Sequence, residues 1–230
     1  MNIKTSLAKQ IPIPILNNFL LFFPFLYKTR FLNYESYVDK ISINELTQGI
    51  ENVKNLSGDV IECGSARCGT TCILANYLKN NNIKKKIYAL DSFEGFDEIE
   101  LKKENELGFT HATKKDFTYS SIDYVTKKIK NLQLSEYVTP IKGYFEDSLP
   151  KINSDFCFGF IDCDLQKSME FSAETIWKKL TPGGILFFDD YTSNAFKGAK
   201  IAIDNFVNSH NEEIFEHGIN HRLYQITKTS

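Results

Sequence analysis

The sequence predicts an α/β fold built on a doubly wound, mostly parallel sheet of seven strands with helices on both faces. From residue 58 onward, short and almost continuously apolar runs alternate with segments whose apolar residues recur at helical spacing. Runs of this kind are buried on both faces, as in parallel sheets covered by helices. A loop of small residues follows the first run, and acidic residues end several others. Both features are typical of a Rossmann-like sheet, which binds its ligand at the carboxyl ends of the strands.

The predicted elements alternate regularly along the chain. Parallel strands are predicted at residues 59–64, 86–91, 137–143, 156–162 and 185–190. Helices are predicted around residues 70–79, 122–132, 173–180 and 199–206. The TPGG segment at residues 181–184 is expected to turn the chain, and two short strands are expected near 214–216 and 222–227. Residues 94–120 are expected to form a long loop, of the length of a substrate-specific insertion.

The first 57 residues are predicted to form a helical extension or lid on a domain that spans residues 58–230. The apolar stretch at residues 11–27 is interrupted by Pro12, Pro14 and Pro24, and it is shorter than the ~20 apolar residues that cross a bilayer. No small-residue cleavage site follows it, which disfavours a secretory signal. Three interpretations stay open: a lid, an interface in a homo-oligomer, or a peripheral contact with a membrane.

Charge and cysteine content narrow the function classes. The net charge of -2 disfavours nucleic acid as a partner, because phosphate binding needs a basic surface. The five cysteines are odd in number, and three are crowded between residues 63 and 72. This pattern does not resemble a disulfide framework, and we expect free thiols in a reducing cytoplasm.

The loop after the first strand, residues 62–71, predicts a site for a cofactor with a positive end. The spacing of Gly64 and its neighbours does not fit a dinucleotide loop, and Thr70 stands where a phosphate-binding loop needs lysine. Glu62 would also repel a phosphate but attract the ammonium and sulfonium groups of S-adenosylmethionine. Asp91 ends the second strand, where a carboxylate can accept hydrogen bonds from both ribose hydroxyls.

Carboxylates also end the fourth and fifth strands. Asp162, Asp189 and Asp190 follow neighbouring strands, and Asp164 lies two residues beyond the first. Carboxylates that converge in this way repel one another unless a cation binds among them or some are protonated. Oxygen ligands favour Mg²⁺, with Mn²⁺ as a substitute. For single residues, the alternative is a helix cap or a solvent-facing side chain.

Six segments then carry a family resemblance: VIECGSARCGTT, YALDSFEGF, KGYFEDSLP, FIDCDLQKS, LTPGGILFFDDY and GAKIAIDNF. In order and spacing they resemble the macrocin O-methyltransferase family, over roughly residues 58–207. Members of that family are metal-dependent and methylate sugar hydroxyls on antibiotics and polysaccharides.

The resemblance implies roles for individual residues. It implies that Asp162, Asp189 and Asp190 are metal ligands, and that Asp164 is the general base, with Asp162 beside it in the catalytic site. It implies cofactor contacts from the first two loops and the fourth strand, namely Glu62, Gly64, Ser65, Asp91, Ser92 and Asp162. Phe145 or Glu146 is expected near the adenine. This chain departs from the family at residues 66–69 and at Gln166-Lys167, and the second departure falls near the acceptor.

The predicted function is therefore S-adenosylmethionine-dependent and Mg²⁺- or Mn²⁺-dependent methylation of a hydroxyl on a sugar or a glycosylated small molecule. A small-molecule or glycan acceptor is the expected partner. Three alternatives stay open. One is a catechol-type O-methyltransferase, the second a phosphate-binding NTPase-like protein, and the third a non-catalytic scaffold.

Overall fold

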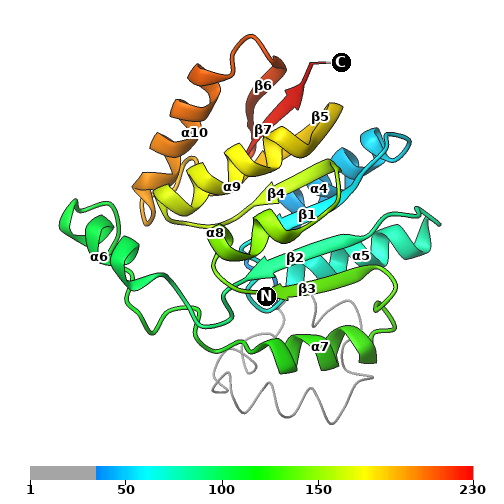
Figure 1. The fold of residues 1–230 in the computed structure, drawn as a ribbon, viewed down its shortest axis with the longest axis horizontal. Helices are drawn as coiled ribbons and strands as arrows, with labels where there is room; N and C mark the ends of the chain where they lie inside the picture. Colours follow the sequence, from blue (N-terminus) through cyan, green and yellow to red (C-terminus); the bar gives the residue numbers. More distant parts are fainter. Residues whose placement is uncertain (1–34, 230) are drawn as a thin grey trace.

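The computed structural model describes residues 35–229, and its centre is one seven-stranded sheet (Figure 1). The strands are β1 Asp59–Cys63, β2 Ile87–Asp91, β3 Val138–Lys142, β4 Phe156–Ile161, β5 Leu180–Phe188, β6 Ile214–Asn220 and β7 Leu223–Lys228. Their order across the sheet is β3-β2-β1-β4-β5-β7-β6. The first five strands are parallel, and β7 pairs antiparallel with both β5 and β6. The predicted fold class is confirmed.

The strand order places a ligand crevice between β1 and β4. From β1 the chain moves outward through β2 to β3, and then returns to the other side of β1 for β4 and β5. At such a switch point the loops after the two central strands leave in opposite directions, and the gap between them binds ligands. The glycine loop follows β1, and the Asp162-Cys163-Asp164 segment follows β4.

Helices cover both faces of the sheet (Figure 1). One face is covered by α4 (Lys40–Val53), α5 (Gly69–Asn80) and α7 (Ile122–Asn131), which share a buried apolar cluster with Phe158 and Phe187 of the sheet. The other face is covered by α8 (Phe145–Ser148), α9 (Gln166–Lys179) and α10 (Lys197–Ser209), around Ile61 and Phe188. Burying one such side chain stabilises the fold by about 1.5–3 kcal/mol. The sheet between two apolar layers is therefore a rigid support for its rim.

Helix α4 is the described part of the predicted N-terminal extension. Asp39 caps its first turn by accepting hydrogen bonds from the backbone N–H groups of Ile41 and Ser42, at 2.8 and 3.1 Å. Leu46 and Ile50 are fully buried against the sheet. This helix therefore packs directly on the domain. The apolar stretch at 11–27, with its lid, oligomer and membrane interpretations, lies outside the described residues, and within residues 35–229 no helix has the length and apolar character to cross a membrane.

The structure corrects two expectations about local structure. Residues 181–184 lie inside β5, which begins at Leu180, and not in a turn before the strand; the pairing with β4 passes from Leu180 directly to Ile185, so these residues form an irregularity within the strand. The segment 94–120 is not all loop, because it contains α6, Glu98–Glu106. Helix α6 carries few apolar residues, so its sequence lacks the helical period. Its N-terminus is capped instead by Asp97, whose carboxylate accepts hydrogen bonds from the N–H groups of Ile99 and Glu100.

Helix α6 lies beyond the carboxyl ends of the parallel strands (Figure 1) and caps the start of α9. The carboxylate of Glu100 accepts hydrogen bonds from the backbone N–H and the hydroxyl of Ser168, at 2.8 and 2.6 Å. Glu104 accepts a hydrogen bond of 2.5 Å from the N–H of Gln166. These first-turn N–H groups have no partner within their own helix, so α6 satisfies them from outside. The contact fixes the chain directly after Asp164.

Candidate active site

A cavity of about 210 Å³ opens at the carboxyl ends of the parallel strands. It is lined by most of the predicted site residues, namely Glu62, Gly64, Ser65, Asp91, Ser92, Phe145, Asp162, Asp164 and Asp190. Two predicted residues, Glu146 and Asp189, are not part of its lining. The cavity therefore joins the predicted cofactor loops to the predicted carboxylate cluster.

Gly64 allows the two central loops to touch. Its φ of +88° is a left-handed conformation that side chains disfavour, and a Cβ atom on it would lie 1.8 Å from the carbonyl oxygen of Asp162. The N–H of Asp162 in turn donates a hydrogen bond of 2.8 Å to the carbonyl oxygen of Cys63. The backbone after β1 thus lies directly against the backbone after β4. The glycine is needed for this contact as well as for the approach of a ligand.

Glu62 is a buried carboxylate beneath the glycine loop. It accepts a short hydrogen bond from the hydroxyl of Thr71. Burial raises the pKa of Glu62 to about 7, the hydrogen bond from Thr71 lowers it, and the nearby Asp91 raises it. A positive group in the cavity would favour the ionised form, because opposite charges attract strongly at a buried site. Glu62 is thus suited to a cationic ligand.

Asp91 shapes the loops around it. One of its oxygens accepts a hydrogen bond of 2.8 Å from the N–H of Ala66, and the other accepts one of 2.7 Å from the N–H of Phe93. Each carboxylate oxygen keeps a further lone pair, so two hydroxyl donors can still bind. The hydroxyl of Ser92 donates to the carbonyl oxygen of Gly95 at 2.6 Å and closes the turn. Asp91 therefore joins the glycine loop to the loop after β2 and still faces the cavity.

The remaining predicted cofactor contacts, Ser65, Phe145 and Glu146, have different surroundings in the structure. Ser65 is buried, and its hydroxyl has the Cys68 thiol near it but no nitrogen or oxygen partner among the described residues. A buried hydroxyl in that state fits a polar ligand. Phe145 lines the cavity, whereas the carboxylate of Glu146 forms an ion pair of 2.8 Å with Lys167 outside it. Of the two candidates for the adenine side, the structure therefore brings Phe145 to the cavity.

Three carboxylates converge in the same cavity. Asp162, Asp164 and Asp190 each offer an oxygen, and these oxygens lie within 4.8 Å of one another. Burial, together with the neighbouring carboxylates, raises the pKa of Asp162 and of Asp164 well above the ordinary value. Asp164 and Asp190 both have left-handed backbones, with φ of 63° and 61°. Such conformations are costly for non-glycine residues and tend to occur at functional sites. The donor set fits a hard divalent cation.

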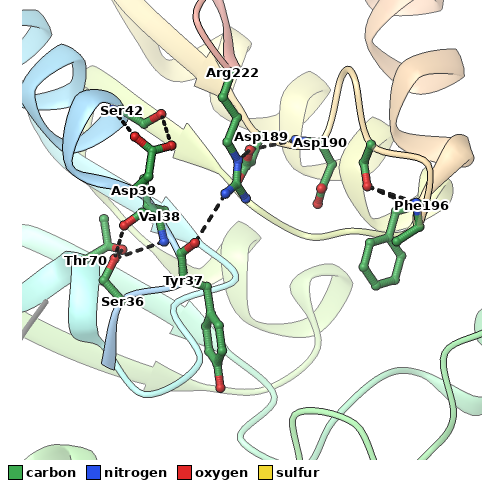
Figure 2. A network of polar contacts seen from close by, with 12 residues as sticks. Ser36, Tyr37, Val38, Asp39, Ser42, Thr70, Asp189, Asp190, Phe196 and Arg222 are labelled. Atoms are coloured by element: carbon green, nitrogen blue, oxygen red, sulfur yellow. Dashed lines mark hydrogen bonds and ion pairs between the residues drawn. The ribbon is translucent and has the colours of Figure 1, made fainter. Parts of the chain in front are cut away.

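Asp189 does not belong to this cluster in the structure. It is fully buried, and its two oxygens face the guanidinium of Arg222. Figure 2 shows Arg222 extending to Asp189 and, on its other side, to the backbone carbonyl of Tyr37. The convergent set thus contains Asp164, predicted as the base, in place of Asp189, predicted as a ligand.

Residues 35–39 cover the glycine loop from outside. Glu35 is buried and forms ion pairs with Arg67 at 2.6 Å and with Lys128 at 2.7 Å. The chain at Glu35 passes so close that a Cβ atom on Gly69 would lie 2.4 Å from its backbone. The hydroxyls of Ser36 and Thr70 are 2.8 Å apart. The loop's shape therefore depends on this segment, which the sequence patterns did not connect to it.

Aromatic side chains form the wall above the carboxylates. Phe96 and Phe117 meet edge to face with ring centroids 5.3 Å apart, and Phe196 lies 6.0 Å from Phe96. Tyr37 contacts Phe117 at 5.8 Å. All four line the cavity. They come from four separate segments, so no local motif could have grouped them.

The fold and the geometry of the site together match an enzyme of the class I methyltransferase type, with the predicted cofactor loop after β1 and the predicted acidic rim. A model of the macrocin O-methyltransferase (TylF) family matches residues 34–225. The chain therefore belongs to this family, and this membership disfavours the NTPase-like and scaffold alternatives. S-adenosylmethionine is the methyl donor expected for such enzymes.

The individual relatives share little sequence identity with this chain. The chain is 24% identical over 153 residues to the 8-demethyl-8-(2,3-dimethoxy-alpha-L-rhamnosyl)-tetracenomycin-C 4'-O-methyltransferase of Streptomyces olivaceus. The match spans 62% of this chain and 56% of that enzyme, so just over half of the relative's length is covered.

Two solved structures share the fold. The O-methyltransferase NovP superposes with a TM-score of 0.70 at 22% identity, covering 82% of this chain and 80% of NovP. The calicheamicin methyltransferase CalS11 gives 0.66 at 16% identity, covering 94% of this chain and 91% of CalS11.

Proposed function

We propose that this O-methyltransferase transfers the methyl group of S-adenosylmethionine to a hydroxyl of a sugar or glycosylated small molecule, with the help of a divalent cation. The observation that carries this proposal is the meeting of a cation-attracting cofactor pocket and a three-carboxylate cluster in one cavity. The relative from Streptomyces olivaceus is named for methylation of a rhamnosyl tetracenomycin, and CalS11 for a rhamnose 3'-O-methylation. These names support a sugar acceptor.

The cofactor half of the proposal rests on three side chains. Asp91 is placed to accept hydrogen bonds from ribose hydroxyls, and Ser65 offers the cofactor a buried hydroxyl that lacks a nitrogen or oxygen partner. Glu62 supplies negative charge toward the ammonium and sulfonium groups. Phe145 provides an apolar surface for the adenine.

The chemical half rests on the convergent carboxylates. Asp162, Asp164 and Asp190 would hold Mg²⁺ or Mn²⁺. A cation bound there supplies a Lewis acid that lowers the pKa of the acceptor hydroxyl. Asp164, the predicted general base, would accept the hydroxyl proton. The new C–O bond forms as the S–CH₃ bond breaks, and S-adenosylhomocysteine leaves.

The aromatic wall is suited to hold the acceptor. Phe96, Phe117 and Phe196 present apolar surface beside the carboxylates, and the C–H face of a sugar packs favourably on such rings. A catechol would also pack there, so the acceptor screen should contain glycosides, nucleotide sugars and catechols. Turnover of a glycoside or nucleotide sugar and none of a catechol is the expected result.

Removal of the metal tests the proposal. With an acceptor from that screen, enzyme stripped with EDTA should lose at least about 100-fold in kcat, and Mg²⁺ or Mn²⁺ should restore it. Calorimetric titration with S-adenosylmethionine in EDTA is the control, and its Kd should change by less than about threefold, because Glu62, Ser65 and Asp91 are not members of the cluster. Full activity in the presence of chelator would reject the metal, and no heat of cofactor binding would reject the cofactor.

A further inference from the structure

A group of charged side chains is buried beside the glycine loop, and the proposed chemistry does not use it. It consists of Glu35, which precedes α4, Arg67 from the loop and Lys128 from α7. One oxygen of Glu35 accepts a hydrogen bond of 2.6 Å from Nη2 of Arg67, and the other accepts one of 2.7 Å from Nζ of Lys128. The side chains of Glu35 and Lys128 have no exposed surface. Two positive charges and one negative charge are thus shielded from water.

This charged group is in direct contact with the glycine loop and the cavity. The Nζ of Lys128 also donates a hydrogen bond to the carbonyl oxygen of Arg67, within the loop. The cationic ends of Arg67 and Lys128 lie 5.6 and 5.4 Å from the centre of the Tyr124 ring, and the hydroxyl of Tyr124 donates to Glu35. Glu35 itself lines the cavity. A change of charge in this group would therefore act at the wall of the predicted cofactor pocket.

The charge of Lys128 reaches Glu62, the carboxylate proposed to attract the cofactor. Burial raises the pKa of Glu62 to about 7, and the ammonium of Lys128 lowers it. Burial likewise raises the pKa of the Cys72 thiol to about 12, while Lys128 lowers it and Glu35 raises it. Lys128 and Glu35 thus act with opposite signs on the same interior. Because buried charges are screened much less than exposed ones, Glu35 offsets a positive charge that would otherwise act on the pocket.

This balance matters because the methyl donor and its product differ in charge. S-adenosylmethionine carries a sulfonium charge that S-adenosylhomocysteine, a neutral thioether, lacks. An additional positive charge beside the pocket would therefore weaken binding of the donor more than binding of the product. A change in packing alone would weaken both, because the two molecules share their adenosine and amino acid parts.

We infer that Glu35 is a specificity-determining residue for the cofactor: it offsets the buried charge of Lys128 and so shifts the preference of the pocket toward the sulfonium-bearing donor and away from the neutral product. This inference rests on the proposed function, because it presupposes that S-adenosylmethionine binds beside Glu62. It assigns roles to Glu35 and Lys128, which none of the sequence motifs contains.

Calorimetric titration of variants with both molecules tests the inference. Glu35→Gln keeps the shape of the side chain and removes its charge, and we expect the Kd for the donor divided by the Kd for the product to rise at least about fivefold. Glu35→Gln/Lys128→Met restores the net charge of the group, so the ratio should return to within about twofold of the wild type. The control, Glu51→Gln, removes a carboxylate from an exposed ion pair with Lys54 and should leave the ratio within about twofold.

The single variant Lys128→Met should have the opposite effect. It removes a positive charge and leaves Glu35 paired with Arg67, so the ratio should fall at least about threefold. Breaking a buried ion pair is destabilising, and Lys128→Met carries the test should Glu35→Gln not fold.

The outcomes separate the inference from the proposed function. If Glu35→Gln weakens both molecules equally, or if the double variant does not recover the wild-type ratio, Glu35 has only a structural role and the inference is wrong. A ratio that stays the same or rises in Lys128→Met also overturns it. In each of these cases a wild type that binds S-adenosylmethionine leaves the proposed cofactor standing. A wild type that gives no heat with either molecule overturns the proposed cofactor and the inference together.

Discussion

Substitution of Asp190 by asparagine should lower kcat about a thousandfold and leave the Kd for S-adenosylmethionine within about threefold. The substitution removes one of the three carboxylates that converge within 4.8 Å, and with it a full negative charge. The predicted cofactor residues Glu62 and Asp91 line the same cavity but are not members of this carboxylate cluster, and they are unchanged. Steady-state kinetics and calorimetric titration of the cofactor measure the two effects separately.

A matched substitution, Asp204→Asn, tests whether the loss of any one negative charge lowers kcat. Asp204 lies on α10 in an exposed ion pair with Lys200, at 2.6 Å, so Asp204→Asn removes the same charge away from the cavity. Its kcat should stay within about twofold of the wild type, because exposed ion pairs contribute little. Were Asp190→Asn to retain wild-type kcat, the carboxylate cluster would have no part in the chemistry.

Substitution of Gly64 by alanine should be the most damaging small change to the fold. Its Cβ atom would lie 1.8 Å from the carbonyl oxygen of Asp162, which is backbone and cannot rotate away, and the φ of +88° adds strain. We expect the free energy of unfolding to fall by about 3 kcal/mol or more, because overpacking and strain act together. The Kd for S-adenosylmethionine should rise at least about tenfold as the two loops separate. Urea unfolding and calorimetry measure these changes.

Gly218 in β6 provides the control for this substitution. A Cβ atom placed there meets nothing within 4 Å, so Gly218→Ala should alter the free energy of unfolding by less than about 0.5 kcal/mol. If Gly64→Ala were as stable as Gly218→Ala and bound the cofactor normally, the contact between the two central loops would not matter to either property.

The fold could be predicted because its signals are local. The central parallel strands β1 and β4 are short, mostly apolar runs such as residues 156–161, and their burial on both faces by helices produces that pattern directly. Helix α6 was missed because it is held by caps and by the contacts of Glu100 and Glu104 with α9, which leave no apolar period. The turn predicted at residues 181–184 was misplaced, because the chain already pairs with β4 at Leu180 and pairs again from Ile185, which leaves these residues as an irregularity inside β5.

The sequence could predict only those parts of the site that lie at the ends of the strands. Carboxyl ends of parallel strands share one edge, so the meeting of Asp91 with Asp162 and its neighbours at one cavity follows from the strand pattern. Which of Asp189 and Asp190 faces the cavity depends on a left-handed backbone and on a partner, Arg222, from the turn between β6 and β7, and neither has a local signal. The aromatic wall likewise depends on tertiary contacts between distant segments.

The most direct test of the account is a crystal structure with Mn²⁺ and S-adenosylhomocysteine, with anomalous scattering used to locate the ion. The account predicts one strong anomalous peak, about 2.0–2.4 Å from oxygens of Asp162, Asp164 and Asp190. A map without a peak among these carboxylates, or with their side chains turned apart around the bound cofactor product, would contradict it.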